Sequence, residues 1–128
     1  MILRIFLDDV RQPEQCATYM HLRIGKRNPI YLEEWLVVKN YDEFKEAIDK
    51  HYPYIQTVSF DHDLAYEHYI DGDQGKIQDG YKEKTGADCA QYLCDFYKSK
   101  DAPLPECLIH SMNPIGCERI AYILRRAR

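Results

Sequence analysis

The 128-residue sequence lacks any hydrophobic run long enough to cross a membrane or to form a signal peptide. Its N-terminal run, MILRIFL, is short and is interrupted by Arg4. It also lacks an excess of positive charge, because 17 Lys and Arg side chains stand against 21 Asp and Glu. The resulting net charge of −4 gives no bulk attraction to duplex nucleic acid. We therefore expect a cytoplasmic protein without a membrane partner.

The cysteines lack the number and spacing of a disulfide framework or a zinc site. There are 5 of them, an odd number, and no CxxC pair occurs. We expect most of them to be small buried hydrophobic residues. The sequence also contains neither GxGxxG nor GxxxxGK[ST], so nothing supports nucleotide binding through those loops.

What the sequence does contain is an alternation of short apolar segments and amphipathic segments. We predict strands at 2–7, 34–38, 57–60 and 106–111, and helices at 40–52, 85–99 and 113–128. Asn40, Thr85 and Asn113 are placed to cap the three helices. This alternation predicts one α/β domain over residues 1–128, a three-layer sandwich with a mainly parallel sheet. The strand order common to flavodoxin-like folds would be 2-1-3-4.

Polar side chains follow three of the four predicted strands, where the strands end. They are Asp8 and Asp9, then Asp61, His62 and Asp63, then His110, Ser111 and Asn113. Ligands of parallel sheets bind outside the carboxyl ends of the strands, so we expect these side chains to share one edge. Neighbouring carboxylates repel one another unless a divalent cation, a shared proton or a basic side chain offsets the repulsion. Oxygen ligands suit Mg²⁺, and the histidines would tolerate Mn²⁺.

Each of these residues also has a structural interpretation. Asp9 could cap the following segment and Asp63 could open a turn. His62 could be exposed without a role, and His110 could be a core histidine with satisfied hydrogen bonds. The segment SMNPIG starts a helix, and its backbone N–H groups beside Ser111 could equally bind an anion.

The segment 65–84 is polar and is too long for a minimal strand-to-helix connection. We interpret it as a flap over the site that brings a lysine such as Lys84 to a ligand; the alternative is an insertion without fixed structure.

Several segments together resemble one family over nearly the whole chain. LDD with Arg11, SFDHDL, KTG and HSMNPIG are similar to the receiver-like family proposed to process cyclic phosphates, a relative of two-component receiver domains. The resemblance implies a receiver-like fold, an acidic metal-dependent site, and a role on cyclic or terminal phosphates of RNA or nucleotides. By this match Asp8 and Asp9 bind metal, Asp61 is the phospho-acceptor equivalent, and Ser111 is the hydroxyl residue after the fourth strand.

The resemblance also shows a departure. The last predicted helix follows the fourth strand, so we expect the fifth strand of a receiver domain and its phosphate-contacting lysine to be missing. Arg11 or Lys84 could replace that lysine.

Our leading hypothesis is a metal-dependent phosphoesterase that acts on a phosphorylated small molecule or an RNA end. The predicted metal residues are Asp8, Asp9, Asp61 and Asp63. The predicted catalytic residues are Asp61, His62 and His110, and the predicted phosphate-binding residues are Ser111, Asn113, Arg11 and Lys84. Proton transfer by His62 requires the third strand to stop by about Asp61 and the ring to face His110 or Ser111. The alternatives are a phospho-accepting signalling receiver and a non-enzymatic binding or adaptor module.

Overall fold

The computed structural model describes residues 2–17, 29–64 and 84–128. The predicted flap therefore lies outside the described residues, except for Lys84. The strands are β1 (Leu3–Leu7), β2 (Leu36–Val38), β3 (Ile55–Phe60) and β4 (Glu106–Ile109). The helices are α2 (Tyr41–His51), α4 (Gly86–Ser99) and α5 (Pro114–Ala127), with 3-10 turns η1 (Pro29–Leu32) and η2 (Tyr52–Tyr54). Residues 13–17 are also helical.

The four strands form one parallel sheet in the order β2-β1-β3-β4. This order confirms the prediction of a receiver- or flavodoxin-like α/β fold. Parallel neighbours need crossover connections. β2 pairs with one side of β1, and the chain then crosses back so that β3 pairs with the other side of β1. The described residues contain no fifth strand. In the order β2-β1-β3-β4, β1 and β3 are the two central strands, so their carboxyl ends lie side by side.

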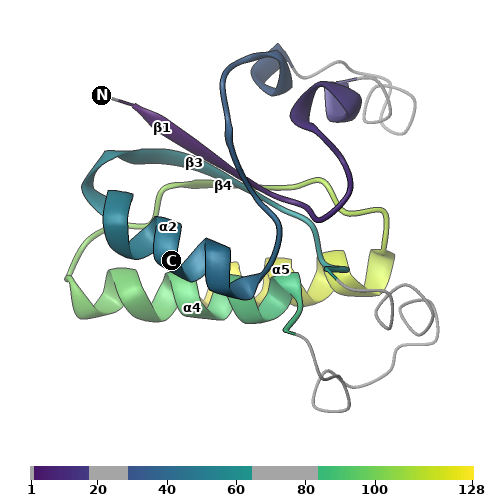
Figure 1. Ribbon diagram of the computed structural model, residues 1–128. Helices are drawn as coiled ribbons and strands as arrows, with labels where there is room; N and C mark the ends of the chain where they lie inside the picture. Colours follow the sequence, from purple (N-terminus) through teal and green to yellow (C-terminus); the bar gives the residue numbers. More distant parts are fainter. Residues whose placement is uncertain (1, 18–28, 65–83) are drawn as a thin grey trace.

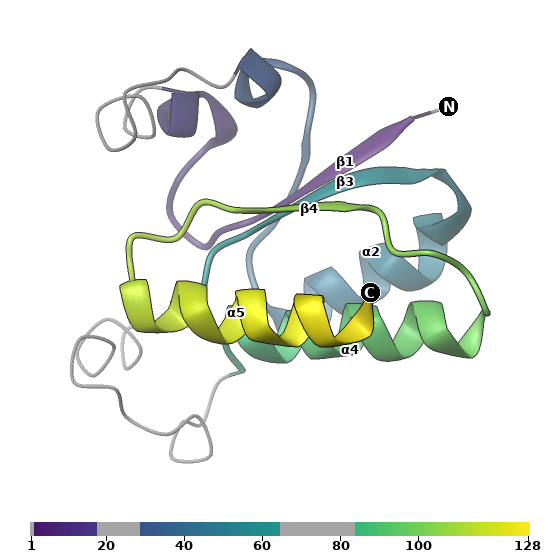
Figure 2. The same cartoon turned by 180° about the vertical axis from the view of Figure 1, so that it is seen from behind.

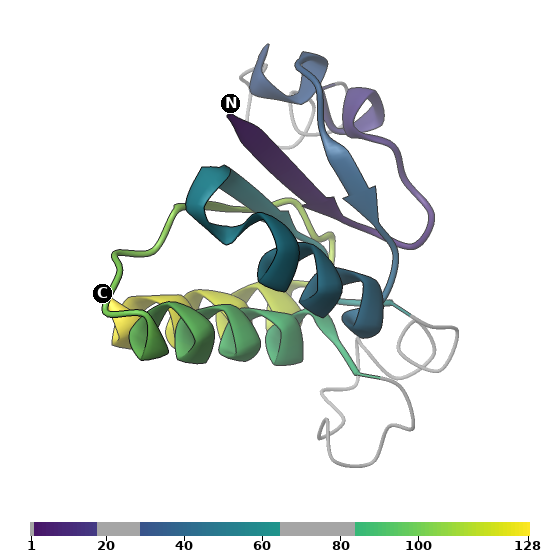
Figure 3. The ribbon, with the colours of Figure 1, turned by 60° about the vertical axis from the view of Figure 1, so that its left-hand side comes forward.

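The sheet has two unequal faces. Figure 1 shows α2, α4 and α5 on one face, with residues 13–17 and η1 on the other. Figure 2 shows α4 and α5 side by side from behind, and Figure 3 shows the same layers from a third direction. We call the two sides the helix face and the Phe6 face. Alternation along β1 sends Ile5 and Leu7 into the helix-face core and Phe6 into the other.

The Phe6 face carries a small aromatic core. Phe6, Cys16, Ala17 and Tyr31 are buried there, and the half-buried Trp35 packs against them. The rings of Tyr31 and Trp35 are stacked at 5.5 Å, and the Trp35 indole N–H donates to the Ile30 carbonyl at 2.8 Å. This core is formed mainly by side chains, because η1 is short and supplies little helical surface.

The predicted helix starts are confirmed. The side chains of Asn40 and Asn113 accept hydrogen bonds from backbone N–H groups in the first turns of α2 and α5, and Thr85 with Asp88 forms a capping box on α4. All 5 cysteines are free thiols, and three of them are buried. Among the described residues, no helix is long and apolar enough to cross a membrane.

Candidate functional site

The polar residues after β1, β3 and β4 are held at one edge because the sheet pairing continues one residue past each strand. The backbone N–H groups of Asp8, Asp61 and His110 each donate to the carbonyl of the last residue of the neighbouring strand, at 2.9 to 3.0 Å. These residues therefore lie in one row across the sheet. β3 ends at Phe60, so the strand stops where the His62 hypothesis requires.

Three carboxylates in this row form a group that can hold a divalent cation. Oxygen atoms of Asp8, Asp9 and Asp61 all lie within 4.8 Å of one another. Asp8 and Asp61 are buried, Asp9 is half-buried, and Asp61 Oδ2 is buried without a hydrogen-bond partner among the described residues. An all-oxygen donor set with an unsatisfied carboxylate atom fits a hard cation such as Mg²⁺. Asp63 is not part of this group.

Asp8 is held in its ionised form. Its Oδ1 accepts hydrogen bonds from the backbone N–H groups of Val10 and Arg11, both at 2.9 Å. Its Oδ2 accepts from His110 Nε2 at 3.1 Å and from Arg11 Nη1 at 3.4 Å. Burial acts to raise the pKa of Asp8, but the hydrogen bonds from His110 and the backbone outweigh it, so the pKa lies below its ordinary value.

Asp61 has the opposite electrostatic environment. Burial, and then the negative charge of Asp8, raise the pKa of Asp61 to about 8. The carboxyl group therefore keeps its proton near neutral pH unless a positive charge replaces it. Its backbone is fixed by close packing, because a Cβ atom on Gly86 would lie 1.7 Å from the Asp61 carbonyl oxygen.

His110 lies on the Phe6 face, and both of its ring nitrogens have hydrogen-bond partners. Its Nε2 bonds Asp8, its Nδ1 lies 2.7 Å from Ser59 Oγ, and Ser59 Oγ lies 2.8 Å from the Tyr31 hydroxyl. The ring stacks on Phe6 with centroids 4.3 Å apart. Burial lowers the pKa of His110, against the opposing effect of Asp8. Asp8, His110 and Ser59 follow the order of an acid–histidine–serine triad, but Ser59 lies buried behind His110 and its hydroxyl is bonded to both His110 and Tyr31.

His62 lies on the helix face, in a different network. Its Nδ1 bonds Asp63 Oδ1 at 2.9 Å, and Asn113 Nδ2 donates to the same oxygen at 3.2 Å. The ring packs against α5 at Gly116, where a Cβ atom would lie 2.3 Å from His62 Cγ. The predicted position of this ring, facing His110 or Ser111, is wrong: the ring is bonded to Asp63 and packs on Gly116, on the face opposite His110. His62 Nε2 is buried and has no partner among the described residues.

Ser111 and Asn113 hold the start of α5. Ser111 Oγ accepts from the Asn113 backbone N–H at 3.1 Å, and Asn113 Oδ1 accepts from the Gly116 N–H at 3.1 Å. Asn113 thus joins the cap of α5 to the Asp63–His62 pair. These contacts give both residues a structural role, and their predicted binding of phosphate stays a prediction.

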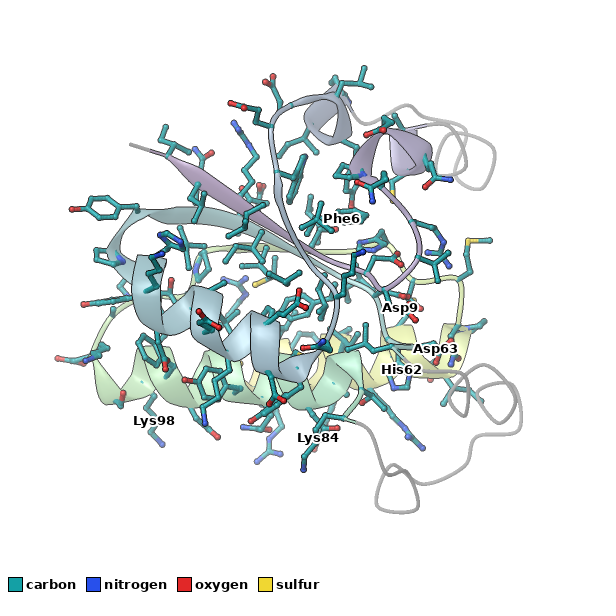
Figure 4. The ribbon with its side chains drawn as sticks, in the orientation of Figure 1. Phe6, Asp9, His62, Asp63, Lys84 and Lys98 are labelled. Carbon is teal, nitrogen blue, oxygen red and sulfur yellow. The ribbon has the colours of Figure 1, made fainter. Side chains whose placement is uncertain are left out.

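The two predicted basic residues lie in different places. Arg11 is beside the acidic group, with its side chain 22% exposed and in contact with Asp8. Lys84 is exposed and lies near the start of α4, apart from Asp9, His62 and Asp63 in Figure 4.

Sequence reasoning missed Ser59, Tyr31 and Gly116. Ser59 had a signal, a hydroxyl inside the apolar strand TVSF, whereas Tyr31 stands outside every predicted strand and helix, between residues 7 and 34. Gly116 stands inside a helix, where a glycine with no turn to form indicates close packing.

A parallel sheet of order 2-1-3-4 with a three-carboxylate group across the ends of β1 and β3 defines a receiver-like domain. Within this class, the sequence model of the cyclic-phosphate processing receiver domain matches residues 3–126, so the chain belongs to that family. This confirms the resemblance found from the sequence. Searches of curated proteins and of solved structures gave no match.

Proposed function

We propose that this protein is a metal-dependent phosphoesterase that acts on a cyclic or terminal phosphate of a nucleotide or an RNA end. The observation that carries the proposal is the group of Asp8, Asp9 and Asp61, in which Asp61 Oδ2 is buried and unsatisfied among the described residues. A divalent cation, Mg²⁺ or Mn²⁺, would supply polarisation of the phosphoryl group and compensation of its developing negative charge. Membership of a family linked to cyclic-phosphate processing supports the substrate class.

The proposed proton-transfer group is His62. Its Nδ1 is held by Asp63, and its Nε2 is the only imidazole nitrogen of His62 and His110 without a partner among the described residues. An imidazole that is held at Nδ1 and leaves Nε2 without a partner can donate or accept a proton at a defined position, once substrate reaches that buried nitrogen. Asp63, predicted as a metal ligand, is better explained as the residue that orients His62.

His110 has a different proposed role. Both of its nitrogens are occupied, so its contacts support the orientation of Asp8 rather than proton exchange with a substrate. Arg11 is the best-placed candidate to contact a phosphate, because its charge lies at the acidic group and its side chain reaches solvent. Ser111, Asn113 and Lys84 remain weaker candidates for that role.

The test is turnover of 2′,3′-cyclic nucleotides and of RNA ending in a cyclic phosphate, followed by ³¹P NMR with Mg²⁺ or Mn²⁺. We expect a phosphomonoester product with wild-type protein and none with Asp61→Asn. Absence of product with every metal and substrate would contradict the proposal.

The signalling-receiver alternative predicts an aspartyl-phosphate on Asp61 after treatment with a small phosphodonor. The carboxyl group is 1% exposed and its pKa of about 8 weakens it as a nucleophile at neutral pH. Mass spectrometry of the treated protein separates the two functions. The binding-module alternative predicts neither a product nor an adduct.

A further inference from the structure

Asp8 makes hydrogen bonds of unequal length. Three are short: the backbone N–H groups of Val10 and Arg11 lie at 2.9 Å, and His110 Nε2 lies at 3.1 Å. The fourth, from Arg11 Nη1 to Asp8 Oδ2, is 3.4 Å long. A carboxylate offers about four lone-pair positions, so these contacts already occupy Asp8. A cation that binds Asp8 must therefore replace one of them.

The four donors differ in how easily they can leave. The two backbone N–H groups belong to the turn that follows β1. His110 is fully buried, stacked on Phe6 and anchored at its other nitrogen by Ser59. The Arg11 guanidinium ends a long side chain that is 22% exposed, and it makes the longest contact. It is the donor that can withdraw without moving the backbone or opening the core.

The positive charge of Arg11 also reaches the second buried carboxyl group. Asp61 belongs to the same group of carboxylates as Asp8, whose Oδ2 the Arg11 guanidinium contacts at 3.4 Å. Asp61 Oδ2 has no hydrogen-bond partner among the described residues, so it can bind a cation without displacing a protein group. The acidic group thus offers one unsatisfied oxygen at Asp61 and one that Arg11 occupies at Asp8.

We propose that Arg11 competes with the divalent cation for Asp8 Oδ2, and that the displaced guanidinium then binds the phosphate of the substrate. This inference rests on the cation site of the proposed function and adds an exchange within it. His110 keeps Asp8 in position when Arg11 leaves, because its hydrogen bond to Asp8 lies on the buried side. Arg11 would thereby stabilise the acidic group before the cation arrives and contact the phosphate afterwards.

The competition predicts that removing the charge of Arg11 strengthens cation binding, whereas most substitutions beside a metal site weaken it. In Mn²⁺ titrations followed by electron paramagnetic resonance, Arg11→Gln should bind the cation about tenfold more tightly than wild type, because a repelling and competing charge is gone. Arg11→Lys should fall between the two. Lys98→Gln removes an exposed charge far from the site in Figure 4 and should match wild type.

The same samples give a second readout. Without cation, Arg11→Gln should melt at a lower temperature than wild type, because the carboxylates lose their compensating charge. With Mn²⁺ bound, inorganic phosphate should bind Arg11→Gln more weakly than wild type. A side chain with only a structural role would instead weaken cation binding and melting temperature together.

Each outcome distinguishes this inference from the proposed function. If wild type binds Mn²⁺ and Arg11→Gln binds it equally or more weakly, the competition is overturned and the cation site stands. If neither binds Mn²⁺, the cation site itself is overturned. If only Arg11→Gln binds, the competition is supported. Equal phosphate affinity of the two Mn²⁺-loaded proteins would overturn the exchange to phosphate.

Discussion

His62 and His110 lie on opposite faces of the same sheet edge, and their surroundings differ in one respect. On the Phe6 face, both nitrogens of His110 have partners, and the chain of hydrogen bonds continues to Ser59 and Tyr31. On the helix face, His62 is nearly as buried but leaves Nε2 without a partner among the described residues. A buried polar atom without a partner costs stability, so its retention is better explained by chemistry than by folding.

The largest expected effect is a loss of turnover that differs between substitutions of His62 and of His110. His62→Gln should lower turnover about 10²- to 10⁴-fold, the usual contribution of a general acid or base, while Mn²⁺ affinity stays near that of wild type. His110→Gln should weaken Mn²⁺ binding and lower the melting temperature, because Asp8 loses its buried donor. Steady-state kinetics and Mn²⁺ titration measure both.

His51→Gln, in the last turn of α2, is the matched control and should behave as wild type. Equal losses of turnover and cation affinity in His62→Gln and His110→Gln would remove the distinction between the two faces.

The next effect compares the two buried carboxyl groups as pH changes. The pKa of Asp61 is raised from 3.8 to about 8 on folding, so its contribution to stability is present in acid and is lost as pH rises through that window. Asp61→Asn should therefore stabilise the cation-free protein by a few kcal/mol at pH 8 and by little at pH 4.

Asp8 should respond in the opposite direction. Its pKa is lowered on folding, so its contribution is present above 3.8 and is lost as pH falls below it. Asp8→Asn should then destabilise the protein at pH 8. Both variants should lose the rise in melting temperature that a divalent cation gives to wild type. Thermal melts at pH 4, 6 and 8 with and without Mg²⁺ test these signs, and a cation-dependent rise that persists in both variants would place the cation elsewhere.

A smaller effect tests the packing that fixes His62. In Gly116→Ala, the new methyl group would overlap the His62 ring, so we expect a loss of about 1–3 kcal/mol of stability together with reduced turnover. Urea denaturation and kinetics measure the two losses. Glu118→Ala, two residues along α5 and exposed, should change neither. Wild-type turnover in a destabilised Gly116→Ala protein would show that the position of the ring does not matter.

The smallest effect concerns the chain behind His110. Ser59→Ala should cost about 1–2 kcal/mol, because it leaves a ring nitrogen of His110 and the Tyr31 hydroxyl without their partner. Turnover should fall far less than in His62→Gln. A loss of turnover as large as that of His62→Gln would give Ser59 a catalytic role despite its burial.

The sequence was sufficient to predict the fold because each element has a local cause. Apolar runs marked the strands, three of which end in Asp or His, and Asn40, Thr85 and Asn113 marked the helix starts. It was also sufficient to predict which residues gather at the edge, since parallel strands present their carboxyl ends together.

The partners within the edge could not be predicted in the same way. Whether His62 faces the helices or His110 depends on how the chain turns after Phe60 and on the space left by Gly116, a contact between distant parts of the chain. The hydrogen bond between Ser59 and His110 spans 51 residues and has no local signature. Asp63 carried the same charge as the metal-site acids, and only its contacts with His62 and Asn113 distinguish it.

The stacking of Trp35 on Tyr31 gives the protein a fluorescent reporter confined to one face. Trp35 is the only tryptophan of the chain, and it also packs edge-on against Phe6, whose ring stacks on His110. Its emission should therefore shift to longer wavelength when the Phe6 face opens to water, and should barely respond to substitutions at Gly116 or His62. One optical signal can thus follow the unfolding of the Phe6 face while far-ultraviolet circular dichroism follows the three helices on the other side.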